Sequence, residues 1–221
     1  GHSLSINLDS ILRRRNRPEK TSVILTRVEV DPEDPGFQFP TKPVGPILSD
    51  EQVMTEDWDI AETINGPRRV VASPAPKEIL DIDIIESLID KNAIVICCGG
   101  GGIPVISKDG HFVGVSAVID KDRLSALLAI QMNVDALIIS TAIDSVRTGF
   151  GSKDEQKHQK MTIEQAKIHL ANGEFPDGSM GPKVTSAIEA VENLTNLKSI
   201  ICQPGDAVKA LRGESGTIFV K

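Results

Sequence analysis

Four consecutive glycines, Gly99–Gly102, follow an apolar run in the stretch VICCGGGGIPV, residues 95–105. A continuous apolar run of this kind is typical of a strand that is buried on both faces. Glycines at the carboxyl end of such a strand let the backbone approach a ligand closely and present its N–H groups to an anion. The stretch matches neither the Gly-x-x-x-x-Gly-Lys-Ser/Thr phosphate loop nor the Gly-x-Gly-x-x-Gly dinucleotide fingerprint. The alternative is a tight strand-to-hairpin connection, which needs fewer glycines, so we favour a ligand loop.

Two lysines stand where the sequence predicts the amino-terminal ends of helices. Lys121 lies between Asp120 and Asp122 in VIDKD, and Lys183 ends the stretch DGSMGPK. A cation in this place faces the positive end of the helix dipole, which costs about 0.3 kcal/mol or more. A bound anion would offset that cost. For Lys121 alone, a solvated charge beside a helix cap is an equal alternative, but the two lysines and the glycine loop together favour phosphate binding.

Composition excludes several classes of function. The net charge of −7 argues against a nucleic-acid surface, which needs a clustered basic face. The one basic cluster, Arg13, Arg14, Arg15 and Arg17, is interpreted as the last turn of a helix, where positive charge complements the helix dipole. Cys97, Cys98 and Cys202 lie in apolar runs without a disulfide framework, which fits a reducing compartment. The four histidines show no metal-ligand spacing, and no segment has the about 18 apolar residues of a membrane span. We therefore expect a cytoplasmic protein with no metal site of its own.

The elements that must position these residues alternate between strand and helix along the 221-residue chain, which is long enough for one large domain or two small ones. Strands are predicted at 21–30, 68–73, 93–98, 135–141, 197–203 and 216–221; helices at 4–15, 76–92, 120–133, 162–173, 181–194 and 205–213; and a hairpin at 105–115. Residues 31–49 contain five prolines and are predicted to be neither helix nor central strand. This alternation predicts an α/β fold with a mainly parallel sheet, helices on both faces and ligands at the carboxyl ends of the strands.

Local signals set several of these boundaries. Asp120 is predicted to cap the helix that follows it, and Thr162 to start a capping box. Pro76 is placed in the first turn of one helix, and Pro182 at the first position of another. Asp109 with the following glycine predicts the turn of the hairpin.

Four separated motifs, FQFPTKPVGP, CCGGGGIPV, VSAVIDKD and DGSMGPKV, occur in the order and at the spacing of carbamate kinases. The likeness continues through RRVVASPAPKEIL and the closing GESGTIFV. The sequence thus resembles carbamate kinase, a member of the amino-acid-kinase family. The resemblance implies a three-layer αβα sandwich, a homodimer and phosphoryl transfer between ATP and carbamate, most often run from carbamoyl phosphate and ADP. It also implies that Mg²⁺ accompanies the nucleotide.

The resemblance also implies a role for each motif. It assigns residues 1–30 to the remnant of an amino-terminal substrate and dimer lobe, 31–75 to a protruding subdomain, and 76–221 to the αβα nucleotide-binding lobe. The implied catalytic residues are Lys42, Lys121, Asp122 and Lys183; the substrate pocket is formed by Gly99, Gly100, Gly101 and Gly102; and the nucleotide contacts come from Asp120, Thr141, Asp144, Met180 and Lys183. Lys42 would reach the site from the protruding subdomain, and an aspartate, Asp120 or Asp122, would orient the lysines. No general base is needed, because the carbamate oxygen is already an anion.

The sequence departs from the family pattern in three places. The family's Gly-Gly-Asn phosphate loop and its Gly-Asn-Gly motif do not occur in these 221 residues. From this we expect a carboxyl-terminal part of a longer carbamate kinase, inactive by itself. The loop 141–147 reads TAIDSVR, where the family has Thr-Asp-x-Asp-Gly-Val-Tyr, and Ser116 replaces a glutamate. Two alternatives stay open: a non-catalytic homologue that acts as a binding module, and another amino-acid kinase, against which Lys42 argues.

Overall fold

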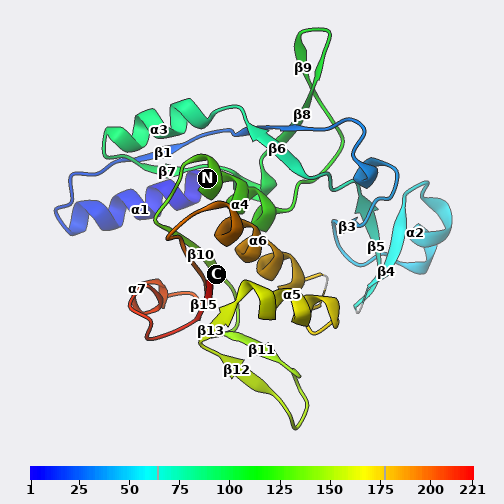
Figure 1. Cartoon of the computed structure of the whole chain (residues 1–221). Coiled ribbons are helices and arrows are strands. Elements are labelled where there is room, and N and C mark those ends of the chain that lie inside the picture. Colours follow the sequence, from blue (N-terminus) through cyan, green and yellow to red (C-terminus); the bar gives the residue numbers. More distant parts are fainter. Residues whose placement is uncertain (64, 177) are drawn as a thin grey trace. The chain divides into compact units, whose positions relative to one another are not determined.

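The computed structural model describes residues 1–63, 65–176 and 178–221, and the chain divides into two compact units, Gly1–Leu124 and Ser125–Lys221. The boundary between them falls inside helix α4, Lys121–Gln131 (Figure 1). Each unit contains a four-stranded sheet, with strand order β6-β2-β8-β9 in the first and β10-β14-β15-β13 in the second. Among the described helices, none combines the length and the apolar character that crossing a bilayer requires.

The first unit contains most of the strands. Its elements are α1 (His2–Arg14), β1 (Thr21–Val23), β2 (Arg27–Val30), η1 (Pro35–Phe37), β3 (Lys42–Pro43), α2 (Asp50–Thr55), β4 (Ile60–Thr63), β5 (Gly66–Val71), β6 (Pro76–Ile79), α3 (Ile82–Asp90), β7 (Ile94–Ile96), η2 (Gly99–Gly101), β8 (Ile103–Lys108) and β9 (His111–Gly114). Strand β2 pairs with β8 in parallel and with β6 in antiparallel, and β8 and β9 form the expected hairpin. Val28, Val30 and Ile79 are almost completely buried and form the core of this sheet.

Two smaller sheets complete the first unit. Strands β1 and β7 pair in parallel, and Figure 1 shows α1 and α3 on opposite sides of this pair. Strands β3, β5 and β4 form an antiparallel sheet within residues 42–71, beside helix α2. Pro43 lies in the edge strand β3, where the lack of an N–H group is tolerated. Helix α2, which was not predicted, begins with a capping box between Ser49 and Gln52.

The second unit is a sheet covered by helices on both faces. After the end of α4 come β10 (Ala136–Ser140), β11 (Val146–Thr148), β12 (Gln156–His158), β13 (Lys160–Thr162), α5 (Ile163–Ala171), α6 (Met180–Asn193), β14 (Lys198–Cys202), α7 (Ala207–Leu211) and β15 (Thr217–Val220). Ile201 and Phe219 belong to the large core cluster under α5 and α6, whereas Ile200 and Cys202 pack with Ala210 of α7. Neighbouring residues of a strand face opposite sides of a sheet, so each strand contributes to both layers, as the α/β class requires.

The pairing of the strands is mixed. Strands β10 and β14 are parallel, as are β13 and β15, while β14 and β15 are antiparallel. In the first unit, β6 and β9 likewise add antiparallel edges to the parallel pair of β2 and β8. The α/β class is therefore confirmed, but the sheets contain more antiparallel pairs than a mainly parallel sheet would have, because β8 and β9 follow each other through a short turn instead of a helix.

Three predicted boundaries were wrong. The strand predicted at 21–30 is interrupted, and its two parts, β1 and β2, pair with different neighbours. Residues 76–79, placed in a helix, form strand β6 at the edge of the sheet, where Pro76 costs no hydrogen bond. The helix begins only after Asp81, whose carboxylate binds Arg27 at 2.5 Å. Pro182 occupies the third position of α6, because that helix begins at Met180.

Other local signals were read correctly. The Thr162 capping box is present in α5, with Gln165 as its partner. Asp109 and Gly110 both have positive φ, at 49° and 76°, as the tight turn between β8 and β9 requires. The side chain of Asp120 accepts a hydrogen bond from the backbone N–H of Asp122 at 2.8 Å and thus caps α4.

Candidate active site

The glycine loop, Gly99–Gly102, contains two glycines that close packing requires. A Cβ atom on Gly101 would lie 2.0 Å from the carbonyl oxygen of Ile119. A Cβ atom on Gly102 would lie 2.6 Å from the side chain of Val28. Both glycines also have positive φ, which other residues rarely adopt. These contacts hold the loop against the segment that leads into α4.

The other two glycines, Gly99 and Gly100, are exposed and have nothing within 4 Å of the position of a Cβ atom. Gly100 has a φ of 70°, whereas Gly99 does not lie in the left-handed region. Their backbone is therefore the part of the loop that a ligand can approach. The four glycines thus serve two purposes: two allow packing, and two leave an open surface.

Lys42 and Asp120 form an ion pair next to this loop. Lys42 Nζ lies 2.5 Å from Asp120 Oδ2, and the other carboxylate oxygen accepts hydrogen bonds from the backbone of Asp122 and Arg123. Burial opposes the ionisation of Asp120, but Lys42 and the two backbone N–H groups outweigh it and lower the pKa of this carboxyl group. Asp120 is only 8% exposed. It is therefore an ionised, buried carboxylate that holds a lysine in place.

Lys121 and Asp122 follow directly in the first turn of α4. Lys121 Nζ lies 3.4 Å from Asp122 Oδ2, and the lysine side chain is 63% exposed while the aspartate is buried. The contact of Gly101 with Ile119 and the ion pair of Lys42 with Asp120 place these residues in one cluster. We call Lys42, Gly99–Gly102 and 120–122 the Lys42–Asp120 cluster. It brings two lysines, an open glycine backbone and a helix amino terminus together, which is the chemistry of an oxyanion site.

The remaining predicted residues belong to the second unit. Thr141 follows β10, and its N–H group donates to the carbonyl oxygen of Cys202 at 2.9 Å. Met180 is the first residue of α6, after Ser179 at the N-cap position. Lys183 lies in the first turn of the same helix and is half-buried.

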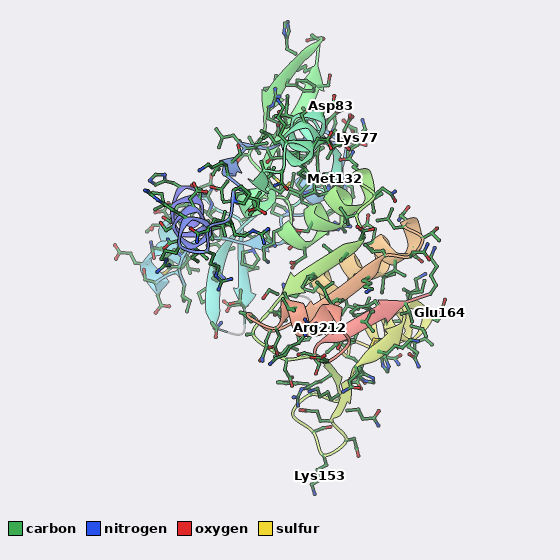
Figure 2. All side chains as sticks on the ribbon, turned by 90° about the vertical axis from the view of Figure 1, so that its left-hand side faces the viewer. Lys77, Asp83, Met132, Lys153, Glu164 and Arg212 are labelled. Carbon is green, nitrogen blue, oxygen red and sulfur yellow. The ribbon has the colours of Figure 1, made fainter. Side chains whose placement is uncertain are left out.

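Asp144 is the centre of a network of charges on the β11–β12 hairpin, the tip of which carries Lys153 (Figure 2). Its carboxylate contacts Lys157 Nζ at 2.7 Å and Arg147 Nη2 at 3.0 Å. Arg147 also binds Glu155 at 2.5 Å. The hydrogen bond from Lys157, followed by that from Arg147, holds the pKa of Asp144 well below its usual range. Two carboxylates thus fix the plane of the Arg147 guanidinium group.

Arg147 and Met180 line a pocket of about 550 Å³ in the second unit. The pocket is lined by Ile143, Arg147, Gly149, Phe150, Ser152, Asn172, Gly173, Glu174, Phe175, Pro176, Ser179 and Met180. The Glu174 carboxylate accepts a hydrogen bond from Gly149 N at 2.8 Å and so ties two of its loops together. Apolar walls with a few fixed polar groups are typical of a small-molecule site.

Among the residues predicted to bind nucleotide, Met180 lines this pocket, and Asp144 contacts it through Arg147. Sequence reasoning missed Phe150, Phe175 and Glu174. The only signal was an aromatic side chain between glycines in TGFG, residues 148–151, and that pattern is also common in plain turns.

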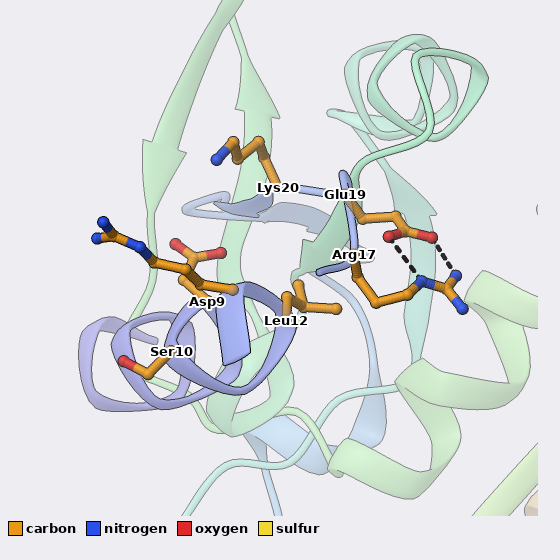
Figure 3. Close-up of a pocket in the computed structure, with 7 residues that line it drawn as sticks. Asp9, Ser10, Leu12, Arg17, Glu19 and Lys20 are labelled. Atoms are coloured by element: carbon orange, nitrogen blue, oxygen red, sulfur yellow. Dashed lines mark hydrogen bonds and ion pairs between the residues drawn. The ribbon is translucent and has the colours of Figure 1, made fainter. Parts of the chain in front are cut away.

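A second pocket, of about 430 Å³, lies beside α1 in the first unit and contains no predicted site residue (Figure 3). Arg17 and Glu19 face each other there, with Arg17 Nε 3.0 Å from Glu19 Oε2. The hydrogen bond from Arg17 lowers the pKa of Glu19 to about 2. Arg17 is thus neutralised by its neighbour, while Arg13 and Lys20 also line the pocket.

Within the described ranges, no group of three or more His, Cys, Asp or Glu side chains could hold a metal ion. Mg²⁺ is held in many nucleotide enzymes by the phosphates and only one or two carboxylates. Asp120 and Asp122 provide two buried carboxylates next to the glycine loop. Both oxygens of Asp120 are engaged by Lys42 and the backbone of α4, and Asp122 pairs with Lys121, so these two carboxylates do not fit a magnesium ion as they stand.

A sheet covered by helices on both faces, as in the second unit, defines an α/β protein. Residues 44–203 match the amino acid kinase family. Carbamate kinase 2 of Staphylococcus aureus is 40% identical over 223 residues, which cover 98% of this chain and 71% of the relative. The chain therefore belongs to the carbamate kinases of the amino-acid-kinase family.

Solved structures agree with this assignment. The carbamate kinase from Giardia lamblia bound to AMP-PNP has a TM-score of 0.89 and 36% sequence identity, and the match covers 100% of this chain and 72% of that one. The same enzyme bound to citric acid has a TM-score of 0.91 and 36% identity, with coverage of 100% and 71%. The expected amino-acid-kinase fold is thus confirmed.

Proposed function

We propose that this protein is a phosphotransferase that exchanges a phosphoryl group between ATP and carbamate, forming ATP from carbamoyl phosphate and ADP. The observation that carries the proposal is the Lys42–Asp120 cluster, in which an ionised aspartate fixes a lysine beside two open glycines. Family membership supplies the substrate class, since the curated and solved relatives are carbamate kinases.

Each residue of the cluster has a separate task in this proposal. Lys42, held by Asp120, neutralises negative charge on the transferred phosphoryl group. The N–H groups of Gly99 and Gly100 bind the oxygens of carbamate or carbamoyl phosphate, since both residues are exposed and form the open part of the loop. Lys121 at the helix amino terminus adds a second positive charge. Catalysis then consists of positioning and charge neutralisation, without a general base.

We assign the nucleotide to the second unit. Its pocket offers apolar walls for a base, and the plane of the Arg147 guanidinium group gives a base a surface to stack on. In this proposal Lys183, in the first turn of α6, binds a nucleotide phosphate. Thr141 and Asp144, which lie between β10 and β11, contact the same nucleotide. The Giardia lamblia relative, which was solved with AMP-PNP, supports a nucleotide as the ligand. Mg²⁺ bound to the nucleotide would neutralise its phosphate charge.

The alternative of a binding module is favoured by one observation. The aromatic residue that the family carries in the nucleotide loop is replaced by Arg147, which is held in two ion pairs. Such a protein would keep the fold and act as a binding module without transferring phosphate. We further propose, from the resemblance, that the protein is a homodimer and is located in the cytoplasm. We also propose that residues 1–221 are inactive by themselves, because the Gly-Gly-Asn and Gly-Asn-Gly motifs do not occur in this sequence.

The test is ATP formation from ADP and carbamoyl phosphate, measured by luciferase. It uses residues 1–221 alone and the same residues fused to the part of the Staphylococcus aureus relative that the match does not cover. We expect turnover by the fusion, its loss in Lys42→Ala, and its retention in Lys153→Ala, a matched change of an exposed lysine on the hairpin. A folded fusion that binds ADP but forms no ATP would establish the binding module instead.

A further inference from the structure

Two adjacent cysteines, Cys97 and Cys98, lie between strand β7 and the glycine loop. Both are half-buried, whereas Cys202, in the second unit, is buried. Successive side chains of an extended strand point to opposite faces, so neighbouring cysteines usually keep their sulfurs apart. This pair is different, because the strand ends at Ile96 and the chain turns at Cys98.

Cys98 adopts a left-handed conformation, with φ 58° and ψ 18°, that is uncommon outside glycine. Two hydrogen bonds hold it there. Its backbone N–H donates to Thr26 Oγ1 at 2.8 Å, and its carbonyl oxygen accepts from Gly101 N at 3.1 Å. The turn therefore belongs to the fold of the glycine loop and is fixed before any ligand arrives.

Because the strand has ended before Cys97 and Cys98 is left-handed, the two side chains are not held on opposite faces of a sheet. A hydrogen bond between them lowers the pKa of Cys97 and raises that of Cys98, and burial raises the pKa of Cys98 further. Cys97 is thus the better nucleophile of the two, since the thiolate is the reactive form. Cys98 keeps its proton and stabilises the neighbouring thiolate.

We propose that Cys97 and Cys98 form a dithiol site for soft electrophiles that bond to two sulfur atoms at once, with trivalent organoarsenicals as the representative class. A direct disulfide is the less favourable product. Adjacent Cα atoms are about 3.8 Å apart across a trans peptide, whereas a disulfide needs about 4.4 Å or more. A bridging arsenic atom lengthens the connection between the sulfurs and relieves this conflict.

The reaction is a substitution at arsenic without oxidation or reduction. The Cys97 thiolate attacks the arsenic of an arsenoso compound, and the thiol of Cys98 forms the second As–S bond. The As–O bond breaks and the oxygen leaves as water, which takes one proton from Cys98 and one from solvent, the latter replacing the proton that Cys97 released on ionisation. Among the described residues, no third His, Cys, Asp or Glu side chain joins the pair to make a metal site. Two sulfurs without further ligands suit an electrophile that uses only two.

Phenylarsine oxide and the reduced 221-residue protein test this site by intact-mass spectrometry. We expect one phenylarsenic group per chain, added with the loss of one water, that resists excess glutathione and is removed by 2,3-dimercaptopropanol. Cys97→Ser and Cys98→Gly should each lose this resistant adduct, and the matched variant Cys202→Ser should keep it. Cys98→Gly is chosen because glycine adopts a φ of 58° without strain, so the loop keeps its shape.

The proposal is overturned if no adduct forms, if glutathione removes it, or if Cys97→Ser and Cys98→Gly bind the arsenical as stably as the unchanged protein. Circular dichroism of each variant confirms that it is folded before it is compared. The labelling needs neither nucleotide nor turnover, so its result is independent of the proposed kinase activity.

Discussion

Lys42 Nζ lies 2.5 Å from Asp120 Oδ2, which joins the small β3-β5-β4 sheet to the amino terminus of α4. The same carboxylate caps the helix through its other oxygen. One side chain therefore performs two tasks that substitutions can separate. An asparagine in its place retains the cap but has no charge for the lysine.

Asp120→Asn should reduce phosphoryl transfer more than it reduces stability. Asparagine is as good an N-cap as aspartate, and Lys42, whose side chain is 30% exposed, can be hydrated when its partner is lost. We therefore expect the free energy of unfolding in urea to fall by about 1 kcal/mol. In the active fusion, kcat should fall by about 10-fold or more, which corresponds to about 1.4 kcal/mol of transition-state stabilisation. The KM for ADP should stay nearly unchanged. An unchanged kcat would remove Asp120 from the role of positioning Lys42.

Asp120→Ala is the companion variant, because it removes the cap as well as the charge. The loss of an N-cap alone costs about 1 kcal/mol. We therefore expect a larger loss of unfolding free energy in urea than for Asp120→Asn. Equal stability of the two variants would show that the hydrogen bonds to the backbone of α4 contribute little.

The ion pair also predicts how stability depends on pH. The pKa of Asp120 in the folded protein is lower than normal, because Lys42 and two backbone N–H groups outweigh the effect of burial. Its ionised form therefore stabilises the fold at pH values above the unfolded pKa of about 3.9. This contribution is lost as the pH falls through the folded pKa. The difference in unfolding free energy between the unchanged protein and Asp120→Asn should be constant from about pH 7 to 5 and should shrink below about pH 4; a difference that grows in acid would contradict the assignment.

Sequence patterns predicted the elements of this fold best where the signal is local. The cap at Asp120, the capping box at Thr162 and the turn at Asp109 depend on side chains within a few residues, and all three are present. Residues 76–79 were misassigned because their strand forms only by pairing with β2, more than forty positions away in the chain. No local pattern carries that information.

The candidate site could be predicted in part for the same reason. The glycine loop and Asp120 could be predicted as site residues from their residue types and their positions relative to the predicted strand and helix. The contact between Gly101 and Ile119 is known only from the fold. The pocket lined by Phe150 and Phe175 was missed, because its walls come from separate loops that no motif connects. The roles assigned to the site residues remain predictions.

The glycine loop allows its structural and functional positions to be separated. Gly101→Ala should lower the free energy of unfolding by about 3 kcal/mol, because its Cβ would lie 2.0 Å from a carbonyl oxygen and its φ is 101°. Gly100→Ala has space but a φ of 70°, so we expect a loss of about 1 kcal/mol. Gly99→Ala has neither conflict and should change stability by less than about 0.5 kcal/mol.

Gly99→Ala is therefore the variant that reports on ligand binding. If the loop binds carbamate and carbamoyl phosphate, the fusion carrying this change should have a higher KM for carbamoyl phosphate at nearly normal stability. Urea unfolding and initial rates of ATP formation measure the two effects on the same samples. Normal kinetics in a stable Gly99→Ala protein would place the substrate elsewhere.

The pocket of the second unit predicts a contrast between two cations that bind the same carboxylate. Arg147 and Lys157 both pair with Asp144. Of these two cations, Arg147 is among the described residues that line the pocket, and Lys157 is not. Arg147→Met should therefore raise the Kd for ADP by about 10-fold, or about 1.4 kcal/mol, while Lys157→Met should leave it nearly unchanged. Both pairs are partly exposed, so each variant should lose less than about 1 kcal/mol of stability. Isothermal titration calorimetry with ADP measures the difference, and equal affinities of the two variants would exclude this pocket as the nucleotide site.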